Sequence, residues 1–141
     1  MMALDNLFGI AGSALNAQTA RMNATASNLA NAGAVSASDK DAFRAKRTVF
    51  KTIMAELGSN SPVSTGGVKV SGISDDPKPI ARMSDPGNPS ADKDGYVYLS
   101  NVNEMTEMVE MMAAARSYQN NVEVVNTARQ LMMRTLDIIK S

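Results

Sequence analysis

The sequence predicts a mainly α-helical fold with a small β element: long N- and C-terminal helices packed as a coiled coil, with a short β-rich segment between them. All five prolines lie between Pro62 and Pro89, so the strongest helix breakers gather in the middle of the chain. Both ends lack proline and repeat apolar residues at helical spacing. We therefore expect residues 1–35 and 100–141 to form one discontinuous helical domain. Residues 36–99 should form a linker and a small domain rich in strands and turns.

The N-terminal segment predicts a helix over residues 4–31, followed by Gly33 as a helix stop. It is rich in alanine, a strong helix former. A column of large apolar residues recurs at intervals of seven beside a column of small or mildly polar ones, as in a coiled-coil seam. The large column consists of Phe8, Leu15, Met22 and Leu29. The same stripe also suits an ordinary amphipathic helix that faces the chain's own core.

A second stripe predicts a helix from Val102 to Ile139, with Asn101 as its N-cap and Glu104 as the capping-box partner. At ~1.5 Å per residue this helix would be ~57 Å long, more than a compact domain usually holds. The stripe alternates spacings of three and four, and only Arg129 interrupts it. Its apolar members are Met108, Met111, Ala115, Tyr118, Val122, Val125, Met132, Leu136 and Ile139. We expect both stripes to be assembly interfaces, because the short middle segment cannot cover them.

The middle segment predicts a small, mostly antiparallel β element. Residues 36–41 form a polar linker. Residues 67–71 alternate with a period of two, as a strand does, and residues 95–99 are a second β-prone run. Between them, Asp-Pro-Gly-Asn-Pro at residues 85–89 is a dense turn signal.

The composition excludes much chemistry. The chain has no Cys and no His, which removes thiol nucleophiles, His-based triads and the usual zinc ligands. Paired carboxylates at Asp75-Asp76 and at Asp92 and Asp94 sit beside Pro or Gly, and we interpret them as solvated turn residues. We therefore expect no catalytic residues, cofactor or metal. With 14 basic and 14 acidic residues the charge is balanced, which argues against nucleic acid as a partner.

The chain has no apolar run of the roughly 20 residues that a membrane-spanning helix needs. Its start also lacks the basic region of a cleavable secretory signal. Six methionines lie between Met105 and Met133. We predict that they fill a helix–helix seam, since unbranched Met adapts to irregular packing. The alternative is a soluble binding module in which this Met-rich helix captures a partner helix.

Several motifs resemble one family. Ser-Asn-Leu-Ala-Asn-Ala at residues 27–32 resembles the signature of flagellar axial rod and hook proteins. The stretch from Gly67 to Asn103 is similar in order and spacing to the proximal rod members of that family. Two departures are Asn88, where the family usually has His, and Ser100, where it usually has Pro.

The resemblance implies a structural, non-enzymatic subunit of the basal-body rod, a shaft that transmits torque and leaves an export channel. It implies export from the cytoplasm through the flagellar type III apparatus without a cleaved signal, and assembly in the periplasm with copies of itself and other rod proteins. The terminal helices would line the inner tube, with no insertion into a membrane. The middle segment would face outward, where contact with peptidoglycan is an open question. The resemblance also adds Asn28 and Asn31 to the assembly interface.

Overall fold

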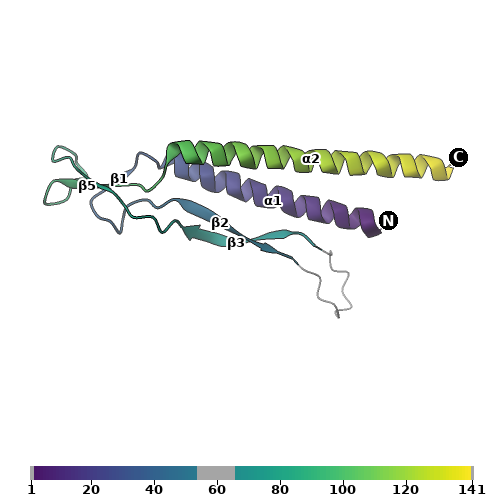
Figure 1. Ribbon diagram of the computed structural model, residues 1–141, viewed down its shortest axis with the longest axis horizontal. Helices are drawn as coiled ribbons and strands as arrows, with labels where there is room; N and C mark the ends of the chain where they lie inside the picture. Colours follow the sequence, from purple (N-terminus) through teal and green to yellow (C-terminus); the bar gives the residue numbers. More distant parts are fainter. Residues whose placement is uncertain (1, 54–65, 141) are drawn as a thin grey trace.

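The computed structural model describes residues 2–53 and 66–140. Its two helices are α1, Met2–Ala30, and α2, Glu104–Lys140. They lie side by side and antiparallel, so both termini are at the same end of an elongated molecule (Figure 1). The predicted combination of two terminal helices with a small β element between them is confirmed.

The described strands form two small antiparallel sheets. The strands are β1, Val35–Ser36; β2, Lys46–Thr52; β3, Val68–Asp75; β4, Arg82–Ser84; and β5, Tyr96–Leu99. One sheet has the order β1-β5-β4, and the other pairs β2 with β3. Ser36, which we expected in the linker, belongs to β1, and β3 extends beyond the predicted strand to Asp75.

The elements stack in three layers, with α1 in the middle. The pair β2–β3 lies along α1 on the side away from α2, and the three-stranded sheet lies beyond the end of both helices (Figure 1). The register runs from Lys46 opposite Asp75 to Thr52 opposite Val68, with Ser71 as an extra residue on β3. Because α1 is covered on two sides, its buried positions need small side chains.

A close backbone approach fixes the start of β3 on α1. The Ser13 hydroxyl accepts a hydrogen bond of 3.1 Å from the Val68 N–H group. Next to it, Gly67 has a φ of 136°, and a Cβ there would lie 3.0 Å from the Ser13 Oγ. Only glycine adopts this conformation readily and leaves room for the contact.

The buried face of α2 follows the predicted spacing but is rotated from the predicted stripe. Its buried and half-buried positions include a row that alternates by three and four: Glu107, Met111, Ala114, Tyr118, Asn121, Val125, Ala128 and Met132. One predicted column, from Met111 to Met132, is therefore on this seam. The other column is displaced by one residue: Ala115 and Val122 lie half-buried at the margin, and Met108 is exposed.

The displacement has a physical cause in side-chain size. Among the residues of the two helices whose burial is described, the buried apolar ones are all alanines: Ala11, Ala17, Ala24, Ala114 and Ala128. Small side chains allow two helix axes to approach closely. In α1 the large residues of the predicted column, from Phe8 to Leu29, are only half-buried, and Ala11 and Thr25 of the small column are buried. Arg129, which interrupted the predicted stripe, is exposed and outside the seam.

The predicted N-cap of α2 is wrong by two residues. The helix begins at Glu104, and the Asn103 Oδ1 accepts hydrogen bonds from the Thr106 N–H group at 3.0 Å and from its hydroxyl at 3.2 Å. Asn103 is therefore the N-cap. Asn101 does not cap the helix because its side chain bonds the strand region instead.

The C-terminal end of α2 projects beyond α1. With 37 residues against 29, α2 continues past the start of its partner (Figure 1). Leu136, Ile138 and Ile139 are consequently 43%, 75% and 75% exposed. Among the described residues, neither helix holds an apolar stretch that could cross a membrane.

The alanine seam makes a testable prediction about size. Ala114→Leu should lower the free energy of unfolding by about 1–3 kcal/mol, because the added atoms overpack a fully buried position. The neighbouring Ala113 is exposed, so Ala113→Leu should change stability by less than about 0.5 kcal/mol. Urea unfolding followed by circular dichroism measures both. Equal effects would show that the helices do not approach through Ala114.

Candidate assembly interface

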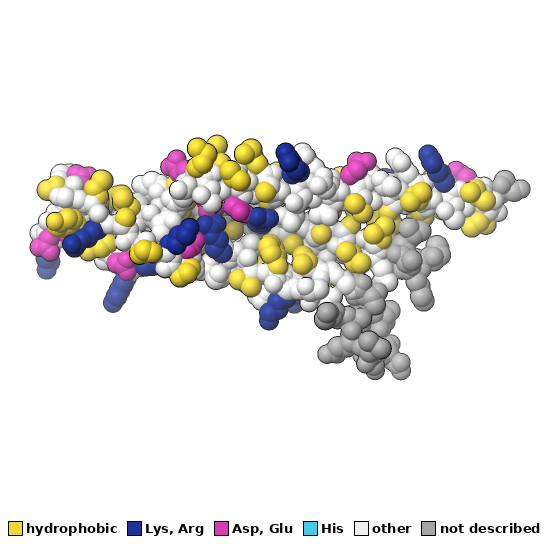
Figure 2. Space-filling view, viewed as in Figure 1, with side chains coloured by type: hydrophobic (Ala, Val, Ile, Leu, Met, Phe, Trp, Pro, Cys, Tyr) yellow, Lys and Arg dark blue, Asp and Glu magenta, His cyan; other side chains and the backbone are white. Residues whose placement is uncertain are grey.

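Most of the exposed large apolar side chains lie on α2. Among the described residues, ten of fifteen such side chains belong to this helix: Met105, Met108, Val109, Met112, Val124, Leu131, Met133, Leu136, Ile138 and Ile139. Figure 2 shows hydrophobic side chains gathered along the outer edge of the N-terminal half of α2. Patches of this kind on a surface mark interaction sites.

The N-terminal half of α2 carries what we name the methionine ridge: Met105, Met108, Val109 and Met112. These four side chains are 72%, 53%, 54% and 64% exposed. Their spacing places them on the part of the helix surface that faces away from the seam. Of the six methionines predicted to fill a helix–helix seam, the three on the ridge and Met133 are exposed in the single chain and do not face α1. The other two, Met111 and Met132, are half-buried on the seam.

The C-terminal half of α2 has a shallow apolar groove. It has a volume of about 330 Å³ and is lined mainly by Leu7 of α1 with Val124, Ala128 and Leu131 of α2. Of the predicted interface residues near it, Val122 and Val125 are half-buried, whereas Leu136 and Ile139 are exposed on the projecting end.

The two asparagines of the Ser-Asn-Leu-Ala-Asn-Ala motif have contacts within the chain. Asn31 lies after the end of α1, where its Nδ2 donates a hydrogen bond of 2.8 Å to the Ser27 carbonyl. This contact satisfies a carbonyl group in the last turn. Asn28 is fully buried and belongs to a larger polar cluster.

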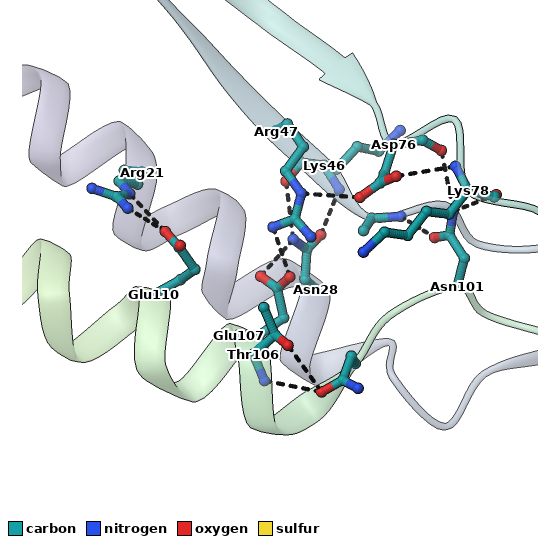
Figure 3. Close-up of polar contacts among 12 residues, drawn as sticks. Arg21, Asn28, Lys46, Arg47, Asp76, Lys78, Asn101, Thr106, Glu107 and Glu110 are labelled. Carbon is teal, nitrogen blue, oxygen red and sulfur yellow. Dashed lines mark hydrogen bonds and ion pairs between the residues drawn. The ribbon is translucent and has the colours of Figure 1, made fainter.

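That cluster, which we name the polar junction, joins both helices to the antiparallel pair β2–β3, which we call the hairpin. It comprises Asn28 of α1, Lys46 and Arg47 of β2, Asp76 after β3, Asn101 before α2, and Glu107 of α2 (Figure 3). The elements that carry these residues are far apart in the sequence. The junction therefore fixes how the three layers meet.

Asn28 pairs with β2 as a neighbouring strand would. Its Oδ1 accepts a hydrogen bond of 2.7 Å from the Lys46 N–H group, and its Nδ2 donates one of 2.9 Å to the Lys46 carbonyl. The same Nδ2 donates to the Glu107 Oε2 at 2.9 Å. An amide side chain supplies an acceptor and a donor on two separate atoms, so Asp, with its acceptor-only carboxylate, could not replace it here.

Glu107 places a carboxylate where water cannot reach it. The residue is 0% exposed, and its Oε1 lies 2.7 Å from the Arg47 Nη1. A buried charge is costly unless it is paired and hydrogen-bonded. Burial acts to lower the pKa of Arg47, but hydrogen bonds and charge from Glu107 and Asp76 outweigh it and raise that pKa above its ordinary value. The guanidinium therefore stays charged beside Glu107.

Asp76 closes the other side of the junction. The hydrogen bond of 3.0 Å from the Lys78 N–H group lowers the pKa of Asp76, burial opposes this, and Arg47 lowers it further. Asn101 then links the backbone: its Oδ1 accepts from the Ala45 N–H group at 2.7 Å, and its Nδ2 donates to the Asp76 carbonyl at 3.1 Å. Two asparagine amides thus hold consecutive N–H groups at the start of β2.

A groove of about 540 Å³ opens beside the junction. Arg21, Arg47, Phe50, Thr106 and Glu110 are among the residues that line it. Arg21 and Glu110 form an ion pair that connects α1 to α2. Both arginines that line it pair with carboxylates, Arg21 with Glu110 and Arg47 with Asp76 and Glu107, so these charges serve structural pairing. Within residues 2–53 and 66–140, no group of three or more acidic side chains is placed to hold a metal ion.

Sequence reasoning missed four junction residues. Asp76, predicted to be a solvated turn residue, is buried, although Asp75 beside it is exposed. Arg47 lies in a basic run at residues 44–51 that is typical of a solvated strand edge, and Asn101 is predicted to cap a helix. Glu107 carried a usable signal, because it stands in line with Met111 and the rest of the seam, where a charge requires a partner.

Comparison with known proteins identifies the family. The family described as "Flagella basal body rod protein" matches residues 8–35, and "Flagellar basal body rod FlgEFG protein C-terminal" matches residues 93–138. "Flagellar basal-body rod protein FlgC" of Yersinia enterocolitica is 50% identical over 137 residues, covering 97% of this chain and 98% of that protein. The proteins of the same name from Salmonella typhimurium and Escherichia coli O157:H7 are 48% and 47% identical over the same shares. The chain belongs to the FlgC family.

This FlgC-family chain is a structural subunit of the flagellar basal-body rod and not an enzyme. The two matched segments cover most of α1 and nearly all of α2. They also contain Asn28, Asn101 and Glu107. The hairpin side of the junction lies outside both segments but inside the region that the FlgC relatives share.

We predict that substituting Arg47 lowers the free energy of unfolding more than substituting its ion-pair partner Glu107. Arg47→Met should cost up to about 3–5 kcal/mol, because it leaves the buried Glu107 carboxylate without its counter-ion. Glu107→Gln should cost only about 1–2 kcal/mol, because the Arg47 side chain is 36% exposed and can turn to water. Urea unfolding of both variants and of the double variant measures the coupling. A larger loss for Glu107→Gln would contradict this account.

Asp76 predicts a specific loss of stability in acid. Its pKa is lowered in the folded chain, so its contribution is complete above the ordinary value near 3.8 and is lost as the pH falls below it. The unfolded state takes up the proton first, which is why acid favours unfolding. Asp76→Asn should therefore lose less stability than the parent chain between pH 5 and pH 2.

The matched control for this prediction is Asp75→Asn. Asp75 is exposed and pairs with Lys46 at the surface, where an ion pair contributes little. Urea unfolding across the acid range compares the three chains. If the free energy of unfolding of both variants fell equally between pH 5 and pH 2, Asp76 would contribute no more to acid sensitivity than Asp75.

Proposed function

We propose that this chain is a subunit of the proximal rod that assembles with copies of itself and with other rod proteins through the outer face of α2. Helices of neighbouring subunits would cover this face and complete a coiled-coil inner layer. One observation carries the proposal: large apolar side chains are exposed on both halves of α2, at residues 105–112 and 124–139. A helix exposed in this way gains stability when a neighbour covers it, since burying apolar area is favourable.

The layer order supports an inner and an outer part. We propose that residues 1–35 and 100–141 form the inner helical domain and that residues 36–99 face outward. Since the hairpin lies on α1 and not on α2, it leaves the outer face of α2 open to neighbours (Figure 1). The half-buried stripe from Phe8 to Leu29 lies between these contacts, and its partly exposed edges would meet adjacent subunits.

The wider role follows from family membership. We propose that the assembled helices surround an export channel and transmit torque along the shaft. The chain would leave the cytoplasm through the flagellar type III apparatus without a cleaved signal and assemble in the periplasm. Its hairpin carries exposed lysines on the outer part, which is where proximity to peptidoglycan would be found.

A charge on the projecting end of α2 tests this proposal. Leu136 is 43% exposed, and Leu136→Asp should abolish rods and hooks, because assembly would bury an unpaired carboxylate. Ser84→Asp adds the same charge at an exposed polar position on β4, away from α2, and should leave assembly intact. Electron microscopy of basal bodies counts rods in cells that lack the natural chain and express either variant. The proposal fails if Leu136→Asp cells build normal rods, or if cells without any copy of the chain do so.

A further inference from the structure

The methionine ridge presents thioether sulfurs to solvent on one side of α2. Met105, Met108 and Met112 follow one another by three and four residues, so they stand in one row, and each is more than half exposed. Leucine would give the same apolar surface without a reactive sulfur. The ridge therefore combines apolar character with chemistry that neither the seam nor the polar junction uses.

A neighbour in the sequence provides the contrast. Met111 directly precedes Met112 but lies half-buried on the seam that faces α1. Met132 occupies the equivalent place further along the same seam. Oxidation of methionine depends on access of the oxidant to the sulfur. These two half-buried methionines should therefore oxidise more slowly than the exposed methionines of the ridge.

We propose that the methionine ridge is a site of reversible oxidation by hydrogen peroxide, and that its redox state decides whether the outer face of α2 can pack against a neighbour. The effect on packing rests on the proposed function, whereas the site of oxidation does not. The unassembled subunit is the form that reacts, because assembly covers the ridge.

The reaction needs only the peroxide. A sulfur lone pair attacks one peroxide oxygen, the O–O bond breaks, and the departing hydroxide takes the proton left on the transferred oxygen. The sulfur loses two electrons and becomes a sulfoxide, and the peroxide becomes water. A methionine sulfoxide reductase reverses the change with electrons from a dithiol.

Oxidation changes the surface in a defined way. A sulfoxide is polar, and its oxygen must find a hydrogen-bond donor when a neighbour buries it. Three such groups on consecutive turns, with Val109 between them, convert an apolar row into a polar one. An oxidised subunit should therefore remain folded, since the seam is untouched, and fail to dock.

The first experiment locates the oxidation. The purified chain is treated with hydrogen peroxide, and peptide mapping by mass spectrometry follows the gain of one oxygen at each methionine. Met105, Met108 and Met112 should oxidise several-fold faster than Met111 and Met132, and circular dichroism should show the helices retained. Equal rates at Met111 and Met112 would overturn the proposal.

The second experiment tests the consequence without peroxide. The triple variant Met105→Gln, Met108→Gln and Met112→Gln mimics the polar oxidised ridge, and the triple Leu variant mimics a ridge that cannot be oxidised. In cells lacking the natural chain, Leu should support rods and Gln should not. Met83→Gln, at a 49% exposed position on β4, is the matched control and should support rods.

The outcomes separate the two proposals. Circular dichroism of the purified variants first confirms that each is folded. The wild-type chain, which builds rods, is the positive control. Normal rods with a folded triple Gln variant, or no rods with a folded triple Leu variant, would overturn the redox proposal. Rods in cells that lack the chain altogether would instead overturn the proposed function, and the oxidation pattern would remain a separate result.

Discussion

The arrangement of the whole chain depends on one buried carboxylate. Glu107 has no contact with solvent, and a lone charge in that position would be strongly destabilising. The first turn of α2 can therefore pack on α1 only when Arg47 and Asn28 are in place beside it. Since Arg47 lies on β2 and Asn28 on α1, satisfying this carboxylate also sets where the hairpin lies. Apolar contacts alone would allow the layers to slide, whereas the hydrogen bond from Asn28 has a direction and, with the Arg47 ion pair, favours one arrangement.

The three-layer order then determines which surfaces remain free. Because α1 is covered by α2 on one side and by the hairpin on the other, it buries small residues such as Ala17 and Ala24. Among the described residues, α2 packs along α1 and meets β2 through the Glu107–Arg47 ion pair at its first turn, so most of its circumference stays exposed. The apolar residues of α2 are therefore open to neighbours through topology, and not because the chain lacks the residues to pack them.

The sequence was enough to predict the two helices, the turn-rich middle and the heptad-like spacing, since these depend on local signals. It was not enough to orient the seam. Pattern reasoning gives weight to large apolar residues and so chose Met108, whereas close packing selected Ala114 and a paired Glu107. The N-cap prediction failed for a related reason: the Asn101–Glu104 spacing favours Asn101, but the Asn101 Oδ1 accepts a long-range hydrogen bond from the Ala45 N–H group, and Asn103 caps the helix instead. Contacts between residues far apart in the sequence decided both points, and local sequence patterns do not contain that information.

The distribution of side-chain size argues that this subunit is built to be completed by others. Among the described residues, Val97 is the only buried apolar side chain larger than alanine, while fifteen large apolar side chains are exposed. Burial of apolar area is the main favourable term in folding, and an alanine contributes little of it. The polar junction specifies the arrangement of layers without adding much net stability, as buried ion pairs generally do. We infer that the single chain has a well-defined arrangement of its layers but a small free energy of unfolding. Binding of neighbours to the folded form would then supply the missing stability.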